Sequence, residues 1–199
     1  MRLVLMDLPG ADRIRFYPLA LSRPIWELRC GITSLAEKLV AKLRPSSVAC
    51  FVPPYMADAY REQTSWPVND PGQLAGDELL LVHPRVKAED FDVDTIPPGH
   101  AVVLDDGTLL AARIGQGQLV PSAAADIDAL VESAKRLPRA NVNLPVWNYI
   151  WDLVLESPHQ IAKDFAALGR SGLEGKIEDP SAIRGSRSDL FIAPGVLVH

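Results

Sequence analysis

Three short apolar runs, separated by segments of helical spacing, constrain the fold of this chain most strongly. The runs lie at residues 2–7 (RLVLMD), 47–52 (SVACFV) and 78–82 (ELLLV). Continuous apolar runs of this length are typical of strands that are covered on both faces. A leucine every four residues predicts a helix over residues 33–43, and residues 55–63 predict a shorter one. The alternation of strand and helix predicts an α/β domain with a mostly parallel central sheet.

The second half of the domain begins with a hairpin signal. Residues 101–104 and 108–114 are alternating apolar runs joined by Asp105-Asp106-Gly107, a sequence that favours a tight turn. An amphipathic helix is predicted over residues 123–136. One or two further helices are predicted over residues 147–168, with a break at Ser157-Pro158 because proline interrupts helical hydrogen bonding.

A different period follows Gly169. Ile177, Ile183, Ile192 and Val198 are spaced by 6, 9 and 6 residues, and residues 192–197 resemble a hexapeptide turn of a parallel β-helix. An ordinary edge strand over residues 190–198 fits the same pattern. Because a solenoid needs about three stacked repeats, the first reading predicts a linker and the first turns of a truncated hexapeptide β-helix over residues 171–199, after a domain over residues 1–170.

Composition and charge exclude several classes of function. The chain has 199 residues, a net charge of −5 and no basic tract that could neutralise a nucleic-acid backbone, so no nucleic-acid polymer is expected as a partner. No apolar run reaches the length of a membrane span and no signal peptide opens the chain, so we expect a cytoplasmic protein without a membrane partner. Cys30 and Cys50 lack metal-site spacing and are expected to be packing residues.

One segment resembles a known family. Residues 15–20 (RFYPLA) with Arg23-Pro24 are similar to the RLxPLTxxxPK segment of sugar nucleotidyltransferases. The longer run PLALSRPIWELRCGITSLAEKL resembles PLTxTRPxxELRxGxxTxxEKW of a divergent bacterial branch of the N-acetylglucosamine-1-phosphate uridyltransferase family. Residues 143–150 (NLPVWNYI), with Ile161 and Asp164-Phe165, resemble the PWDIF segment and the following helix of that branch.

The resemblance implies a fold, a reaction and partners. The fold is a Rossmann-like nucleotidyltransferase domain followed by the start of a left-handed β-helix, through which a homo-oligomer could form. The reaction is the attack of a sugar 1-phosphate on the α-phosphate of a nucleoside triphosphate, with Mg²⁺ as cofactor and pyrophosphate as leaving group. The product expected from that branch is like UDP-N-acetylglucosamine. The alternative is a catalytically degenerate domain that binds a ligand or supports assembly of a β-helix acyltransferase.

Candidate site residues follow the first strand, where an open α/β sheet usually binds its ligand. The cations of the motif would neutralise phosphates, although each could instead be a solvated charge paired with Glu27 or Glu37. The resemblance assigns catalysis to Arg23 and Lys38, and nucleotide or phosphate binding to Asp7, Gly10, Arg15 and Arg29.

Two positions depart from the family pattern and motivate the degenerate alternative. The glycine-rich LAGGxGT loop is replaced by residues 5–11 (LMDLPGA), in which Gly10 remains and Pro9 has no N–H to donate. His83 stands where a metal carboxylate is expected, and histidine is a poor Mg²⁺ ligand. His83 and Asp105 are the metal candidates, although Asp105 and Asp106 also suit a hairpin turn for backbone reasons.

Overall fold

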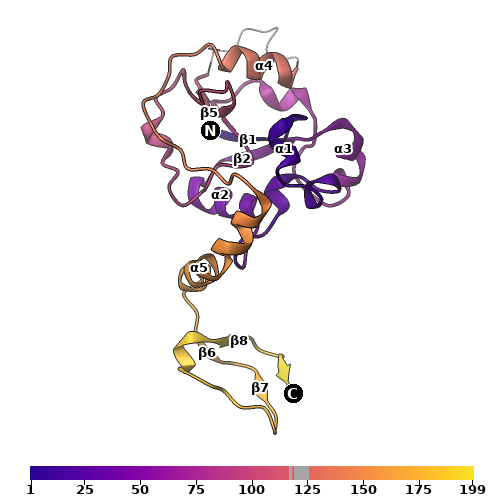
Figure 1. The fold of residues 1–199 in the computed structure, drawn as a ribbon, viewed down its shortest axis with the longest axis vertical. Helices are drawn as coiled ribbons and strands as arrows, with labels where there is room; N and C mark the ends of the chain where they lie inside the picture. Colours follow the sequence, from indigo (N-terminus) through magenta and orange to yellow (C-terminus); the bar gives the residue numbers. More distant parts are fainter. Residues whose placement is uncertain (117, 119–125) are drawn as a thin grey trace.

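The centre of the fold is a five-stranded sheet in the order β2-β1-β3-β5-β4 (Figure 1). The computed structural model describes residues 1–116, 118 and 126–199. β1 is parallel to β2 and β3, whereas β5 is antiparallel to both of its neighbours, so four of the five strands share a direction. The mostly parallel α/β sheet is confirmed. The strands are β1 (Arg2–Met6), β2 (Ser47–Phe51), β3 (Leu79–Val82), β4 (His100–Val103) and β5 (Leu109–Ile114).

The sheet is buried on both faces, which explains the continuous apolar runs. Leu3 and Leu5 of β1 pack into one core cluster, and the alternate residues Val4 and Met6 pack into another. Residues of α2 (Leu35–Leu43) and α3 (Pro54–Arg61) contribute to the first cluster, and residues of α4 (Ile127–Ala134) contribute to the second. The helices thus cover opposite faces of the sheet.

Local signals account for the ends of two elements. Ser34 and Glu37 form a capping box at the start of α2, in which the Glu37 amide donates to Ser34 Oγ at 3.2 Å. The predicted hairpin turn is present: Gly107 takes a φ of 85°, and the Leu104 amide donates to the Thr108 carbonyl at 2.9 Å. The predicted start of α4 at residues 123–125 lies outside the described residues.

The remaining short elements are a turn of α-helix after β1 and five 3₁₀ turns. They are α1 (Ala11–Ile14), η1 (Leu19–Leu21), η2 (Ile25–Glu27), η3 (Pro71–Leu74), η4 (Val93–Thr95) and η5 (Arg187–Asp189).

A single long helix, α5 (Ile150–Leu168), runs through the predicted break. Pro158 removes the hydrogen bond to the carbonyl of Val154, but Val154 is exposed, so water can reach that carbonyl. Trp147 was expected on this helix and instead precedes it, buried in the core. Among the described helices, none combines the length and apolar character needed to cross a bilayer.

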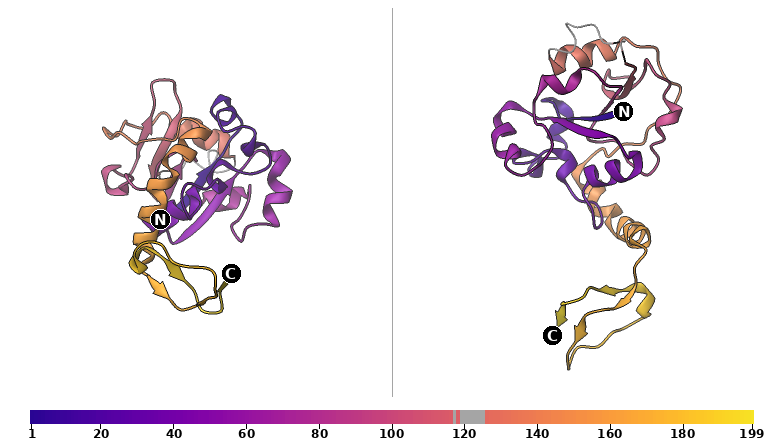
Figure 2. Two further views of the ribbon diagram at one scale, coloured as in Figure 1. Left: turned by 60° about the horizontal axis from the view of Figure 1, so that its bottom comes forward. Right: turned by 180° about the vertical axis from the view of Figure 1, so that it is seen from behind.

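Residues after α5 form two small parallel ladders set apart from the central sheet (Figures 1 and 2). β6 (Gly172–Leu173) pairs with β8 (Phe191–Ile192), and β7 (Lys176–Ile177) pairs with β9 (Leu197–Val198). The residues described here therefore do not extend the central sheet as an edge strand. The β-helix over residues 171–199 stays a prediction.

Candidate functional site

A cavity of about 700 Å³ opens at the carboxyl ends of β1 and β3. Met6 ends β1, His83 follows β3, and Leu109 begins β5; all three line the cavity. In the sheet, β2 lies on one side of β1 and β3 lies on the other, so the chain reverses its direction of winding at β1. Open α/β sheets bind ligands at such a switch point, so this cavity is the candidate active site.

The loop after β1 forms one wall of the cavity and contains two of the predicted residues. Gly10 lines it, and a Cβ built on Gly10 would meet no atom within 4 Å, so the space beside this loop is open. Arg15 also lines it, with its guanidinium 5.7 Å from the centroid of the Tyr149 ring. The Arg15 carbonyl accepts a hydrogen bond from the Ile150 amide at 3.2 Å. The start of α5 thereby positions Arg15.

Two carboxylates meet at the hairpin turn beside this loop. Asp12 Oδ2 accepts a hydrogen bond from Thr108 Oγ1 at 3.2 Å, and Asp106 Oδ1 accepts one from the Thr108 amide at 2.9 Å. The hydrogen bonds from Thr108 lower the pKa of Asp106. Both carboxylates line the cavity and lie close together because they share a partner. They present oxygen atoms on two segments that are 94 residues apart.

Arg85 lies beneath this pair with 1% of its side chain exposed, and its Nη2 is 3.3 Å from Asp12 Oδ2. Among the described residues, Nε and Nη1 of Arg85 find no hydrogen-bond partner. Burial, followed by repulsion from Arg15, lowers the pKa of Arg85, and Asp12 opposes this. A buried cation thus lies behind the cavity wall and contacts Asp12, which lines the cavity.

His83 lines the cavity and is held uncharged. Burial, with a contribution from the charge of Arg85, lowers the pKa of His83 from 6.5 to about 4. Its Nδ1 accepts from the Arg85 amide at 3.3 Å, which assigns the remaining proton to Nε2 at neutral pH. The imidazole is therefore a neutral wall residue of the cavity.

The depressed pKa of His83 predicts a pH dependence of stability. The unfolded chain binds a proton below about 6.5 and the native chain does not until about pH 4. The contribution of neutral His83 is therefore complete above pH 6.5 and is lost as the pH falls towards 4, by about 2–3 kcal/mol. Denaturant titrations at pH 7.5, 5.5 and 4.5 should show this slope, and His83→Gln should remove it. An equal slope in His83→Gln would assign the effect to other groups.

The charge of the cavity suits a cation together with a phosphate. Its walls carry more carboxylates than cations; the carboxylates are Asp12, Asp106, Asp128 and Glu132, and the cations are Arg15 and Lys135. Groups of three or more metal-ligating side chains do not occur among the described residues. Mg²⁺ is commonly held by one or two carboxylates together with substrate phosphates, and Asp12 with Asp106 meets that requirement. Asp105, the predicted ligand, lines a different cavity, beside Arg139.

Asp7 is buried and points into the protein, away from the cavity. Its Oδ2 accepts from the Ile25 amide at 2.8 Å and pairs with Arg13, which also donates to the carbonyl of Ala20. Burial alone would lower the pKa of Arg13, but the hydrogen bond and charge of Asp7 outweigh it and raise that pKa. This pair ties the start of the motif to the end of β1.

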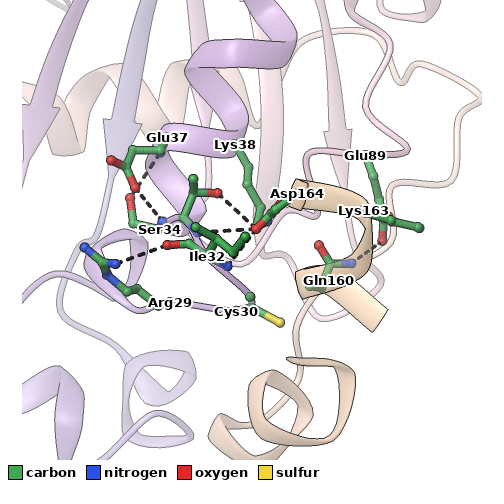
Figure 3. A network of polar contacts seen from close by, with 12 residues as sticks. Arg29, Cys30, Ile32, Ser34, Glu37, Lys38, Glu89, Gln160, Lys163 and Asp164 are labelled. Carbon is green, nitrogen blue, oxygen red and sulfur yellow. Dashed lines mark hydrogen bonds and ion pairs between the residues drawn. The ribbon is translucent and has the colours of Figure 1, made fainter. Parts of the chain in front are cut away.

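The segment over residues 29–38 contacts α5, and Figure 3 shows the network. Asp164 of α5 pairs with Lys38 and accepts from the Ile32 amide at 2.9 Å. Arg29 Nη1 donates to the Ile32 carbonyl at 3.1 Å. Lys38 lines a second cavity of about 490 Å³, whose described lining residues all differ from those of the first.

Arg23 likewise lies outside the first cavity, and its carbonyl accepts from Arg13 Nη2 at 3.2 Å. Of the predicted residues, the structure therefore gathers Gly10, Arg15 and His83 at the first cavity. Sequence reasoning overlooked Asp12 and gave Arg85 no role. An aspartate three residues before Arg15, and an arginine two residues after His83, were the available signals.

Among solved structures, CTP:phosphocholine cytidylyltransferase from Streptococcus pneumoniae is similar, with 13% sequence identity and a TM-score of 0.45 over 79% of this chain and 98% of that chain. No curated protein matches the sequence. A family described as sugar nucleotidyl transferase matches residues 3–171. Because that match spans most of its length, the chain belongs to the sugar nucleotidyl transferase family.

Proposed function

We propose that the chain forms a nucleotide sugar, of the UDP-N-acetylglucosamine type, from a nucleoside triphosphate and a sugar 1-phosphate. The observation that carries this proposal is the cavity at the switch point, where Arg15, Asp12 and Asp106 converge beside the loop after β1. Family membership supports nucleotidyl transfer as the reaction class. The cavity volume of about 700 Å³ suits a ligand of nucleotide size.

In the proposed reaction, an oxygen of the sugar 1-phosphate attacks the α-phosphorus of the triphosphate. A new P–O bond forms, the bond between the α-phosphorus and its bridging oxygen breaks, and pyrophosphate leaves. Catalysis of phosphoryl transfer depends mainly on position and charge stabilisation. Arg15 supplies a cation at the wall, and the open space at Gly10 allows phosphates to approach the backbone.

The acidic walls assign a role to a divalent cation. Asp12 and Asp106 would hold Mg²⁺, which neutralises triphosphate charge when bound. Arg85, whose Nη2 lies 3.3 Å from Asp12 Oδ2, holds that carboxylate in position. Thr108 donates a hydrogen bond to each of the two carboxylates. In this proposal Lys38 has a structural role, since it pairs with Asp164.

Pyrophosphate release from UTP or dTTP with a hexose 1-phosphate tests the proposal. Arg15→Ala is expected to lower kcat/KM by about 100-fold or more, because it removes a charge-stabilising donor. Arg184→Ala, an exposed arginine in the segment after α5, is the matched control and should retain wild-type turnover. Absence of turnover with all four nucleoside triphosphates and several sugar phosphates would reject the enzyme proposal.

The alternative is a degenerate domain that binds a ligand without turnover. Pro9 in the loop after β1 and neutral His83 in the cavity wall favour it, because Pro9 has no N–H to donate to a phosphate and His83 is not a metal carboxylate. Calorimetry with UTP, with and without Mg²⁺, separates the two proposals. Weak binding that does not depend on Mg²⁺, together with no pyrophosphate, would support the degenerate domain.

A further inference from the structure

Helix α5 carries an apolar stripe on the side that does not face the protein core. The stripe repeats at intervals of 3, 4, 3, 4 and 3 residues through Trp151, Val154, Pro158, Ile161, Phe165 and Leu168. Val154 is 70% exposed and its neighbour Leu155 is 74% exposed, while Trp151, Ile161 and Leu168 are each about half exposed. A run of this kind on solvent-exposed helix positions is unusual, since amphipathic helices normally turn their apolar side inward.

The side of α5 that faces the protein is largely polar. Ser157 Oγ accepts from the Gly31 amide at 3.3 Å, Gln160 donates to Glu89 at 3.1 Å, and Asp164 pairs with Lys38. Leu153 is the one large apolar residue of α5 that is buried. The helix is therefore held by hydrogen bonds, and most of its apolar surface remains uncovered by the described residues.

The charged side chains of α5 point away from the stripe. At 100° per residue, Asp152, Glu156 and Lys163 lie on the opposite side of the helix. On the side away from the protein, the positions that flank the stripe, Leu155 and Ala162, are uncharged. On the other side, Asp164 is paired with Lys38. Repulsion between like charges commonly prevents identical surfaces from pairing. Two α5 helices can meet along their stripes without this repulsion.

We infer that the stripe is an interface for a second copy of this chain, formed by pairing of two α5 helices. Alternate spacing of 3 and 4 residues is the pattern by which helices interdigitate their side chains. The helix has 19 residues and is thus about 28 Å long. With roughly 150–200 Å² for each large side chain, the exposed stripe offers about 500 Å² per copy. A pair that covers the whole stripe buries about 1,000 Å², the threshold for a biological interface and the size of a weak, concentration-dependent one.

A lipid surface fits the same stripe less well. Helices that lie in a membrane interface carry lysine and arginine on their polar side. On α5 that side has two carboxylates, Asp152 and Glu156, against one cation, Lys163, and the whole chain has a net charge of −5. Anionic lipid would therefore repel this helix, whereas a second uncharged stripe would not.

Sedimentation equilibrium of the full chain from about 0.1 to 200 µM tests the inference. The wild-type mass should rise from monomer to dimer across this range. Leu155→Glu should raise the dissociation constant at least tenfold, because it places a carboxylate from each copy at the edge of the apolar seam. Leu155 is exposed in the single chain, so this substitution should leave the circular dichroism spectrum and the Tm nearly unchanged. Glu156→Lys, on the opposite side of α5, is the matched control and should retain the dimer.

Three results would overturn the inference. The first is a wild-type chain that stays monomeric at 200 µM. The second is a dimer that persists in Leu155→Glu with an unchanged dissociation constant. The third is a monomeric chain that binds phosphatidylserine vesicles through Leu155, which would assign the stripe to a lipid surface. None of these readouts requires nucleotidyl transfer, so the inference stands or falls independently of the proposed reaction.

Discussion

Replacement of Gly31 by alanine is expected to destabilise the chain by about 2–5 kcal/mol. Gly31 has a φ of 89°, and a Cβ at this position would lie 2.7 Å from Asp164 Oδ2 and 2.8 Å from the backbone carbon of Gln160. The strained φ contributes about 1–2 kcal/mol, and displacement of a packed helix adds about 1–3 kcal/mol. Urea denaturation followed by circular dichroism measures the loss.

Gly76 provides a control that separates these two effects. Its φ is 90°, nearly the same as that of Gly31, but a Cβ on Gly76 meets no atom within 4 Å. Gly76→Ala should therefore cost about 1–2 kcal/mol, from backbone strain alone. If the two variants lose equal stability, the contact between Gly31 and α5 contributes nothing measurable, and α5 is not tightly docked.

Replacement of Arg13 by alanine is the second substitution with a large expected effect, a loss of about 3–5 kcal/mol. Arg13 and Asp7 are 3% and 1% exposed, and the guanidinium also donates to the carbonyls of Ala20 and Arg23. Without Arg13, the Asp7 carboxylate is buried and keeps the hydrogen bond from the Ile25 amide. The free energy of unfolding, measured in urea at pH 7, should fall accordingly.

An exposed pair of the same residue types is the control for Arg13. Arg61 Nη1 lies 2.5 Å from Asp58 Oδ1, but the side chains are 49% and 98% exposed. Arg61→Ala should therefore change stability by less than about 1 kcal/mol. The double variant Asp7→Ala/Arg13→Ala should be more stable than Arg13→Ala, because it leaves no unpaired buried charge. A double variant less stable than both single variants would contradict this explanation.

The sheet was predictable because its signals are local. Apolar runs with helical segments between them specify buried parallel strands, and Asp105-Asp106-Gly107 specifies a turn that needs a positive φ. The continuity of α5 through Pro158 was not predictable, because it depends on Val154 being exposed. Exposure on one side of a helix is set by what the helix docks against.

The site was predictable only in part, for the same reason. Gly10 and Arg15 follow the first strand directly, so topology alone brings them to the cavity. Asp12 pairs with Arg85 and accepts a hydrogen bond from Thr108, and both partners are more than 70 residues away in the sequence. No local sequence pattern predicts such long-range contacts. Lys38 stands in the motif but lies at another cavity, because the helix that carries it turns towards α5.

The contact between residues 29–38 and α5 changes what the motif RCGITSLAEK can report about a related sequence. Gly31 leaves room for α5, and Lys38 with the amides of Ile32 and Thr33 binds one carboxylate of it. A relative that had lost nucleotidyl transfer would still need these residues to keep its last helix in place. Possession of the motif is therefore a marker of architecture, and a survey for working enzymes should search instead for the residues that line the cavity at the switch point.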